Sequence, residues 1–333
     1  MIRFALFGAG NEGRKVLREL GKEKVSFCID NNKTGEIDGV PIYDLIGAKT
    51  FINEKILVLV TSSKYRDEMI KQLNECGIRD FLVFTSNHIS GSNIERRLNE
   101  REWGKIYINK MDQVLKKVIS SSYSPWTQEI LKITNSGDSV LEIGCGSGES
   151  SLALAKEGRK VSSLDYSQVS IEIVQEIANK CELNLNTFCL DATGELPFEN
   201  QQFDFVFHAG LLEHFYFDER VDLLKKWKRI CKTMISMVPN ADCIPYRVWK
   251  DDLEKKNIWK YGIEMPQKTL YQDFLSAGYK NIKEYTIGSS QVIKNLPEDH
   301  YIRKAFECMR EKGYPLDEWG QGYLLVTIGS VIE

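Results

Sequence analysis

The hydrophobic positions of the chain fall into short apolar runs separated by longer amphipathic stretches. Residues 3–7, 140–143 and 203–207 are runs of this kind, and each is followed closely by glycine. Between such runs the apolar residues recur at helical spacing, as they do over residues 218–230. Strands that alternate with helices predict α/β domains with mostly parallel sheets and helices on both faces.

Three glycines at alternate positions, Gly144, Gly146 and Gly148, lie between an apolar strand and a good helix former at residues 149–155. Because glycine has no Cβ, the backbone at such a turn can take positive φ and let a ligand approach closely. The alternate spacing differs from the G-x-G-x-x-G pattern of dinucleotide sites. We therefore expect a strand, turn and helix that bind a different ligand.

Acidic residues stand at the ends of the neighbouring apolar runs. Glu142 lies inside the strand that leads to the turn, and Asp165 ends the next strand, residues 160–164. A carboxylate about 20 residues after such a turn can accept hydrogen bonds from both hydroxyls of a ribose. Asp191 and Ala192 follow at the end of a third candidate strand. An ordinary βαβ turn with incidental acids is the alternative, but the agreement of these parts in order favours a ligand site.

This order of parts resembles the class I S-adenosylmethionine (SAM)-dependent methyltransferases over residues 120–332. The resemblance implies a seven-stranded, doubly wound Rossmann-like sheet with SAM as the cofactor. It also implies that the glycine turn cradles the methionine part and the ribose, that Asp165 holds the ribose, and that Asp191 with the Ala192 amide contacts the adenine. The cofactor-binding residues implied in this way are Glu142, Gly144, Cys145, Gly146, Gly148, Asp165, Tyr166, Asp191, Ala192 and His208.

Residues 1–86 repeat the strand and glycine-turn pattern on a smaller scale. A strand at residues 3–7 leads into a G-x-G-x-x-G turn, and the strand at residues 25–29 is closed by Asp30. This is the complete first unit of a dinucleotide fingerprint, acid included, but the second half of such a fold is missing. We expect a half-Rossmann parallel sheet that suits a mononucleotide or a purely structural role.

The stretch from residue 29 to residue 42 resembles the small N-terminal domain of bacterial sugar acyltransferases and of some sugar-modifying methyltransferases. The resemblance implies that the domain can hold a nucleotide-activated sugar. An intact but empty turn, in a domain that only packs or dimerises, is the alternative. A nucleotide-binding oxidoreductase run by this domain is a second alternative, although half of a fold is not expected to retain NAD. The candidate nucleotide-site residues are Gly8, Gly10, Gly13 and Asp30.

A polar, glycine-containing stretch at residues 86–93 predicts a domain boundary. Residues 87–119 are therefore expected to form a linker and a bridging amphipathic helix, which lies across the methyltransferase sheet or against the first domain. The methyltransferase domain is expected over residues 120–333.

Two insertions, residues 240–267 and 289–322, follow strands of that domain and so should lie at the ligand-binding edge of its sheet. Aromatic residues interleaved with basic ones suit a lid that stacks on a ring and pairs with a phosphate or carboxylate. Amphipathic helices with aromatic cores and solvated charges are the alternative. The candidate substrate residues are Tyr123, Trp126, Tyr246, Arg247 and Trp249.

Methyl transfer from a sulfonium is an in-line displacement, so the protein mainly has to align the two partners and exclude water. A base is needed only when the acceptor is a hydroxyl or an ammonium. His208 ends the fourth strand, where we expect it to face the methyl group, and His214 begins the following helix. Both histidines are candidate catalytic residues, although the Leu-Glu-His trio that His214 ends is more often structural or cofactor-lining in the enzymes it resembles.

Composition narrows the range of partners. The net charge of −3 over 333 residues gives no overall field that favours nucleic acid or an anionic membrane. No apolar run approaches the ~20 residues of a membrane span, and the start of the chain does not have the pattern of a signal peptide. The eight cysteines form no C-x-x-C pattern, so we expect no metal site and a reducing, cytoplasmic location.

Together these features predict a SAM-dependent methyltransferase whose partner is a small-molecule acceptor. The resemblance of the first domain extends the acceptor to a sugar or a nucleotide-activated sugar of a bacterial glycan or secondary-metabolite pathway. A SAM-binding protein without transferase activity is the alternative, and the atom that is methylated stays open. The sequence also leaves open whether the chain forms a homo-oligomer.

Overall fold

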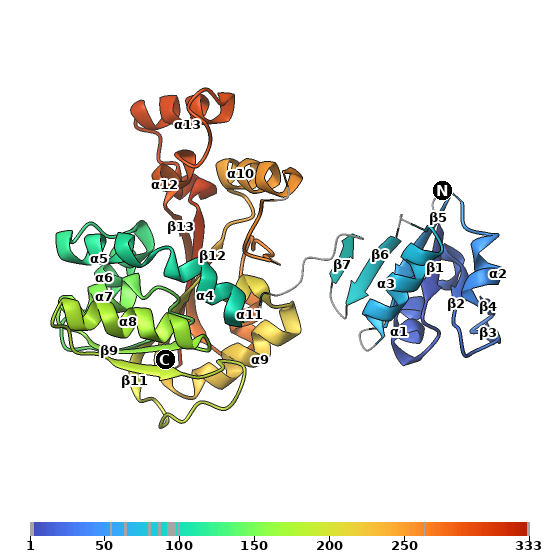
Figure 1. Ribbon diagram of the computed structural model, residues 1–333, viewed down its shortest axis with the longest axis horizontal. Coiled ribbons are helices and arrows are strands. Elements are labelled where there is room, and N and C mark those ends of the chain that lie inside the picture. The colour runs from blue at the N-terminus through green and yellow to red at the C-terminus, as the bar shows by residue number, and fades with distance from the viewer. Residues whose placement is uncertain are drawn as a thin grey trace. The chain divides into compact units, whose positions relative to one another are not determined.

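The structure, a computed structural model, describes residues 3–53, 55–62, 65–78, 81–85, 88–91, 98, 100–256, 258–262 and 264–331. The chain forms two compact units, Met1–Glu95 and Arg96–Glu333, and each has its own sheet (Figure 1). The segment expected as a linker and bridging helix, residues 87–119, is divided between them. Its strand β7 (His88–Gly91) joins the first sheet, whereas its two helices belong to the second unit.

The first unit contains a seven-stranded sheet in the order β3-β4-β2-β1-β5-β6-β7. Its five central strands pair in parallel, and β3 and β7 pair antiparallel at the two edges. Alternate residues of β1 face different cores, since Phe7 packs with Phe27 on one face and Leu6 with Cys28 on the other. The elements besides β7 are β1 (Arg3–Phe7), α1 (Asn11–Leu20), β2 (Val25–Ile29), β3 (Gly35–Ile37), β4 (Val40–Tyr43), α2 (Leu45–Lys49), β5 (Ile56–Val60), α3 (Arg66–Glu75) and β6 (Phe81–Thr85).

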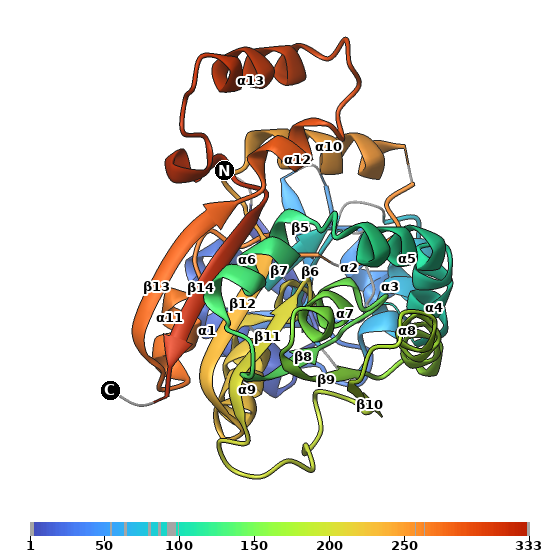
Figure 2. The ribbon, with the colours of Figure 1, turned by 90° about the vertical axis from the view of Figure 1, so that its left-hand side faces the viewer.

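The second unit contains a seven-stranded sheet in the order β10-β9-β8-β11-β12-β14-β13, as the sequence predicted (Figure 2). β14 pairs antiparallel with both β12 and β13, and the other pairs are parallel. The strands are β8 (Ser139–Ile143), β9 (Lys160–Asp165), β10 (Asn186–Cys189), β11 (Phe203–Ala209), β12 (Cys231–Pro239), β13 (Lys280–Ile287) and β14 (Leu324–Ser330).

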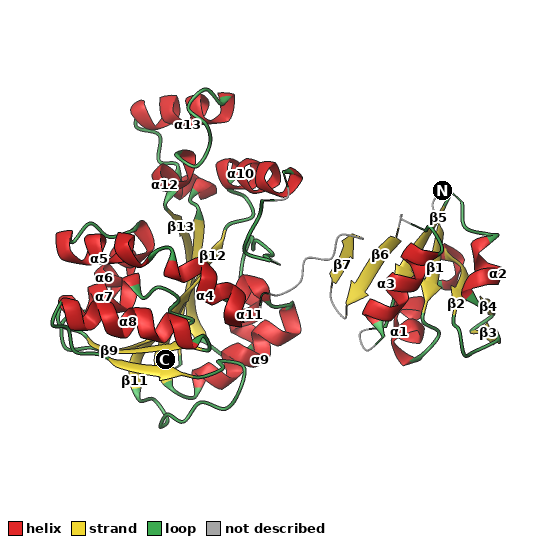
Figure 3. Cartoon of the chain, viewed as in Figure 1, coloured by secondary structure: helices red, strands yellow, loops and turns green. Residues whose placement is uncertain are grey.

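Helices cover both faces of this sheet (Figure 3). Leu141 and Val206 pack against α9 and α11, whereas their sequence neighbours Val140 and Phe207 pack against α6 and α7. The predicted doubly wound α/β architecture is therefore confirmed. The helices are α4 (Glu100–Ile108), α5 (Met111–Ser120), α6 (Pro125–Ile133), α7 (Glu149–Lys156), α8 (Gln168–Lys180), α9 (Phe217–Lys228), α10 (Ile244–Lys255), α11 (Tyr271–Ser276), α12 (Ser289–Ile293) and α13 (Tyr301–Glu311).

The two predicted insertions contribute α10 and the pair α12 and α13. Figure 1 shows these helices beyond the ends of β12 and β13, away from the body of the sheet. The parallel strands β8 and β11 end at the same edge, because parallel neighbours run in one direction. The architecture thus brings the glycine turn after β8, the chain after β11 and the insertions to one end of the sheet.

Candidate active site

The turn after β8 has the backbone that its glycines predicted. Gly144, Gly146 and Gly148 have φ values of 70°, 54° and 75°, in the left-handed region that favours glycine. At Gly148 a Cβ would lie 2.4 Å from a methyl carbon of Val174 in α8. This last glycine therefore allows close packing of two helices, whereas the contact of the first two with a ligand stays a prediction.

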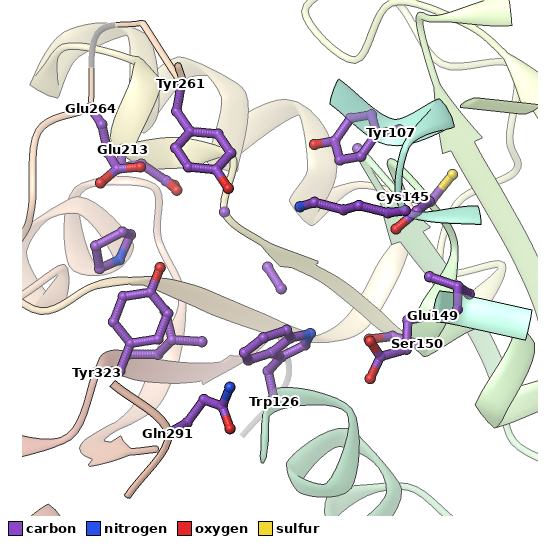
Figure 4. A pocket seen from close by; sticks show the side chains of 18 of the residues that line it. Tyr107, Trp126, Cys145, Glu149, Ser150, Glu213, Tyr261, Glu264, Gln291 and Tyr323 are labelled. Carbon is purple, nitrogen blue, oxygen red and sulfur yellow. The ribbon is translucent and has the colours of Figure 1, made fainter. Parts of the chain in front are cut away.

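A cavity of about 480 Å³ opens beside this turn. Gly144 and Cys145 of the turn line it, as do Ala209 and Gly210 at the end of β11. Helices α4 to α7, the turn after β11 and both insertions also supply wall residues (Figure 4). The cavity therefore combines the turn predicted to bind the cofactor with the segments predicted to bind the acceptor.

Glu142 also lines the cavity, but its carboxylate has a structural role. One carboxylate oxygen accepts hydrogen bonds from the Ser151 backbone N–H at 2.9 Å and from the Ser151 hydroxyl at 2.5 Å. Burial raises the pKa of Glu142 to about 8. The side chain thus fixes the first turn of α7 against the end of β8.

Asp165, predicted to hold a ribose, lies next to the cavity without lining it. Its two oxygens accept hydrogen bonds from the Gly146 N–H at 2.8 Å and the Ser167 N–H at 2.9 Å. The ring of Tyr107 in α4 lies directly above this turn, since a Cβ on Gly146 would come within 2.6 Å of the ring. The ring of Tyr107 therefore packs over the turn whose Gly146 N–H donates to Asp165.

Three further candidate cofactor residues, Asp191 and Ala192 predicted at the adenine and Tyr166, form hydrogen bonds within the chain. A carboxylate oxygen of Asp191 accepts two hydrogen bonds from Thr193, each at 2.8 Å. The Ala192 carbonyl accepts one from the Trp227 indole at 3.1 Å, and the Tyr166 hydroxyl donates one to the Leu98 carbonyl at 3.1 Å. None of the three predicted residues lines the cavity, so their contacts with a cofactor remain predictions.

Helix α4 is the part of the site that the sequence analysis missed. Its Gly104 packs closely on α8, where a Cβ would lie 3.1 Å from that of Val169. Trp103 stacks on Tyr107 with ring centroids 5.7 Å apart and meets the edge of His214 at 5.3 Å. Two aromatic residues at i and i+4 share one helical face, and this spacing is the signal that could have identified them.

His208 does not occupy the position predicted for it. Its side chain is completely buried, and its Nε2 forms a 2.8 Å hydrogen bond with the Ser236 hydroxyl. Burial lowers the pKa of His208 to about 3. The next residue, Ala209, lines the cavity instead, because successive residues of a strand point to opposite faces. The structure contradicts the expectation that His208 faces the methyl group, as either a base or a cofactor contact.

His214 and Glu213 do line the cavity, on the short 3-10 turn Leu212–His214. The Nε2 of His214 lies 3.9 Å from a carboxylate oxygen of Glu213. Glu213 is only 2% exposed, and its Oε2 has no hydrogen-bond partner among the described residues. Burial, together with the nearby Glu264, raises the pKa of Glu213 well above its usual range.

Of the predicted substrate residues, Trp126 and Trp249 line the cavity. Tyr246 is fully buried and donates its hydroxyl to Glu264, which lines the wall in its place. The remaining two residues do not line the cavity: the side chain of Tyr123 is buried elsewhere, and that of Arg247 is exposed on the surface. The insertions therefore shape the cavity as predicted, although only part of the predicted residue set does so. Wall residues that the sequence analysis did not single out for the site are Tyr261, Glu264, Gln291 and Tyr323.

The cavity has acidic and basic regions. Lys117 forms a 2.7 Å ion pair with Glu149, whose other oxygen accepts a 2.6 Å hydrogen bond from the Ser124 N–H. The Lys110 ammonium lies 5.7 Å from the ring of Tyr261, and burial lowers the pKa of this lysine. The acidic wall holds Glu213 together with Glu264, whose pKa burial raises to about 7 (Figure 4).

A separate cavity of about 530 Å³ lies in the first unit, and all four predicted nucleotide-site residues line it. The Asp30 carboxylate accepts hydrogen bonds from the Ala9 N–H at 2.9 Å and the Asn32 N–H at 3.0 Å. At Gly13 a Cβ would lie 1.8 Å from the Gly8 carbonyl oxygen, whereas Gly10 has open space where a Cβ would stand. The turn therefore needs its third glycine for packing and leaves its second one accessible.

Residues 140–234 match the family model described as a methyltransferase domain. The ubiquinone biosynthesis O-methyltransferase of Coxiella burnetii is 40% identical over 83 residues, which make up 25% of this chain and 35% of the relative. The ribosomal protein L11 methyltransferase of Campylobacter concisus is 34% identical over 157 residues, 47% of this chain and 52% of the relative. The chain thus spans about a third to a half of the length of these relatives.

Among solved structures, a SAM-dependent methyltransferase from Thermotoga maritima superposes with a TM-score of 0.49 at 16% identity, covering 70% of this chain and all of that one. The domain match and the relatives support SAM-dependent methyltransferase activity. The resemblance of the glycine turn and the acids near it implied the same activity. No helix of the described residues is both long and apolar enough to cross a membrane.

Proposed function

We propose that this protein transfers the methyl group of SAM to a small-molecule acceptor bound in the cavity of the second unit. One observation carries the proposal. Gly144 and Cys145, at the turn that resembles a SAM site, line the same cavity as the aromatic side chains of Trp126 and Trp249. A cofactor on the turn and an acceptor on the aromatic wall would share one enclosed space, as a direct transfer requires.

The residues that would hold SAM are the turn glycines with Cys145, then Asp165, Asp191 and Ala192. The positive-φ backbone after β8 suits a closely approaching ligand, and the buried Asp165 stands one strand away. When bound, SAM supplies an electrophilic methyl group. The chain itself would align the acceptor and exclude water with its aromatic walls.

His214 is the candidate base of this proposal. It lines the cavity, and its imidazole makes an edge-to-face contact with the ring of Trp103, with the ring centroids 5.3 Å apart. With His208 buried elsewhere, His214 would accept the proton that a hydroxyl or ammonium acceptor must lose. An acceptor that is already a good nucleophile would not need this step.

We extend the proposal to a sugar or a nucleotide-activated sugar as the acceptor. The flat rings of Trp126, Trp249 and Tyr323 suit the apolar face of a sugar ring, and Gln291 and Asn295 offer amides to its hydroxyls. The free state of all eight cysteines is consistent with a cytoplasmic location.

In the first unit, the cavity around Gly10 and Asp30 would bind a nucleotide or a nucleotide-sugar. Thermal unfolding of the full chain in the presence of UDP-glucose and other nucleotide-sugars tests this binding. A ligand should raise the melting temperature of the wild type and not that of Asp30→Ala, while the exposed control Asp67→Ala keeps the shift. No shift with any nucleotide would favour a domain that serves only for packing.

Calorimetric titration with SAM tests the function itself. Asp165→Ala should weaken SAM binding, because each lost hydrogen bond to a charged group contributes about 1.5–3 kcal/mol. The control is Asp222→Ala on the surface of α9, where the carboxylate is 3.5 Å from Lys225. If neither the wild type nor the control binds SAM, the proposal fails. Transfer of labelled methyl from SAM to a panel of sugars then identifies the acceptor.

A further inference from the structure

The acidic wall of the cavity contains a buried carboxyl group with one oxygen that lacks a hydrogen-bond partner among the described residues. Glu213 is 2% exposed, and Oε2 has no hydrogen-bond partner among the described residues. Buried polar atoms in proteins nearly always have a partner. Because Glu213 lines the cavity, the missing partner is expected to come from the molecule that enters it.

A second carboxyl group stands on the same wall. Glu264 is 9% exposed and accepts a hydrogen bond from the Tyr246 hydroxyl. The Met265 N–H donates to the Glu213 carbonyl at 2.9 Å, so the two acids are held together by the backbone. Figure 4 shows both side chains beside the ring of Tyr261.

Among the described residues, Lys250 is a cation that acts on Glu264, but it does so from beyond ion-pair distance, and its ammonium pairs with Glu254. No lysine or arginine of the described residues lies within 4.0 Å of either carboxyl, and the only basic group that close is the imidazole of His214. The cationic residues of the cavity are engaged elsewhere, since Lys117 pairs with Glu149 and Lys110 lies near the rings of Tyr107 and Tyr261. Burial raises the pKa of both carboxyls, so a cation bound beside them would favour their ionised forms.

Aromatic rings surround the acids. The ring centroid of Trp103 lies 5.3 Å from that of His214 and 6.3 Å from that of Tyr261. Tyr323 faces the acids across the cavity (Figure 4). The faces of aromatic rings attract cations, and this attraction is strongest where water is excluded. Two buried carboxyls within such rings form the environment that a protein uses for an ammonium group.

We propose that the acceptor carries a protonated amine and that Glu213, Glu264 and the rings around them form the subsite that binds it. The inference rests on the proposed methyltransferase function and narrows its acceptor to amine-bearing small molecules, such as amino sugars. The two carboxyls would accept hydrogen bonds from the N⁺–H groups, which are stronger than those from a neutral hydroxyl.

The test compares compounds that differ only in an amine or a hydroxyl. The full chain with bound S-adenosylhomocysteine is titrated calorimetrically with glucosamine and glucose, with UDP-glucosamine and UDP-glucose, and with methylammonium chloride. We expect the amine of at least one pair to bind about 10-fold or more tightly than its hydroxyl counterpart. Glu213→Gln should abolish that preference, and Glu264→Gln should reduce it.

The matched control is Glu172→Gln on the surface of α8, which should keep the preference. Equal binding of the two members of every pair, or no binding of any amine, would overturn the inference. So would a Glu213→Gln variant that is folded by circular dichroism and binds the amine as tightly as the wild type.

SAM affinity separates this inference from the proposed function. SAM also carries an ammonium group, so its affinity is measured for Glu213→Gln and Glu264→Gln. An unchanged affinity is expected, and a large loss would assign the acidic wall to the cofactor instead of the acceptor. A wild type that binds no SAM contradicts the proposed function, whereas SAM binding without an amine preference contradicts only the subsite.

Discussion

The ring of Tyr107 lies against the backbone of Gly146, so close that a Cβ on this glycine would be 2.6 Å from the ring. The same glycine donates its N–H to Asp165, the carboxylate predicted to bind the ribose. One side chain of α4 therefore covers both the turn and the acid. A cofactor that used them would have to displace this ring.

The first prediction concerns that displacement. Tyr107→Ala should speed SAM binding, because the covered state no longer competes with the cofactor, and the effect should be on the order of 10-fold in the association rate. Stopped-flow tryptophan fluorescence measures it, with Trp103 beside the ring as a reporter. Tyr301→Ala on α13, 74% exposed, is the control. An unchanged association rate in Tyr107→Ala would show that the ring does not limit entry.

The second prediction concerns His214 as the base. His214→Asn should lower kcat by ~10²–10⁴ for an acceptor that must lose a proton, since general base catalysis contributes about that factor. SAM affinity should change little, which separates catalysis from cofactor binding. Initial rates at several pH values measure both kcat and its pH profile. A variant that retains the wild-type rate would mean that the acceptor needs no base or that another group serves it.

The third prediction follows from the burial of His208. Burial lowers its pKa to about 3 from the ordinary histidine value of 6.5, so between pH 3 and pH 6.5 the unfolded chain binds a proton that the folded chain does not. Stability is therefore complete above pH 6.5 and is lost as the pH falls, by about 1.4 kcal/mol for each unit. His208→Gln should weaken this acid sensitivity without changing the pH profile of catalysis.

Urea unfolding at pH 7 and pH 5 measures the acid sensitivity of each variant. His300→Asn at the start of α13 is the control, because asparagine can retain the capping hydrogen bond that His300 accepts from the Ile302 N–H. Equal losses of stability in the wild type and His208→Gln between the two pH values would contradict the prediction.

The fourth prediction concerns Glu264, for which the free energy of unfolding should change with pH in the opposite direction. Burial raises its pKa to about 7 from the ordinary glutamate value of 4.5, so between these pH values the folded chain holds a proton that the unfolded chain has released. Stability is therefore lost as the pH rises from 4.5 to 7, again by about 1.4 kcal/mol per unit. Glu213, Lys250 and Glu254 are titratable groups near this carboxyl, and the Tyr246 hydroxyl donates a hydrogen bond to it.

Glu264→Gln removes the titration and can still accept the hydrogen bond from Tyr246. The ligand-free variant should then be more stable than the wild type at pH 8, and the advantage should shrink at pH 5. Urea unfolding at the two pH values gives the difference. Glu172→Gln, on the exposed surface of α8, is the comparison for a general change in charge. A variant that is no more stable than the wild type at pH 8 would contradict the raised pKa.

The local sequence determined most helices and strands of this protein and the glycine turn after β8. The three glycines between an apolar strand and a helix former required a left-handed backbone, and φ values of 54° to 75° follow from that requirement. The alternation of apolar runs and amphipathic stretches similarly predicted the second sheet, but only β1, β2, β5 and β6 of the first. These features depend on neighbours within a few residues, which is why the sequence alone sufficed.

The tertiary structure decided which side chains meet in the cavity. His208 and Ala209 are both at the end of β11, but the packing of the sheet directs only Ala209 to the cavity, and a shift of one residue reverses the two. Glu213 and Glu264 lie far apart in the sequence and become neighbours only because the 240–267 insertion folds back onto β11. Tyr107 reaches Gly146 only because Gly104 lets α4 pack closely on α8. Such contacts depend on long-range packing, which the local pattern of the sequence does not encode.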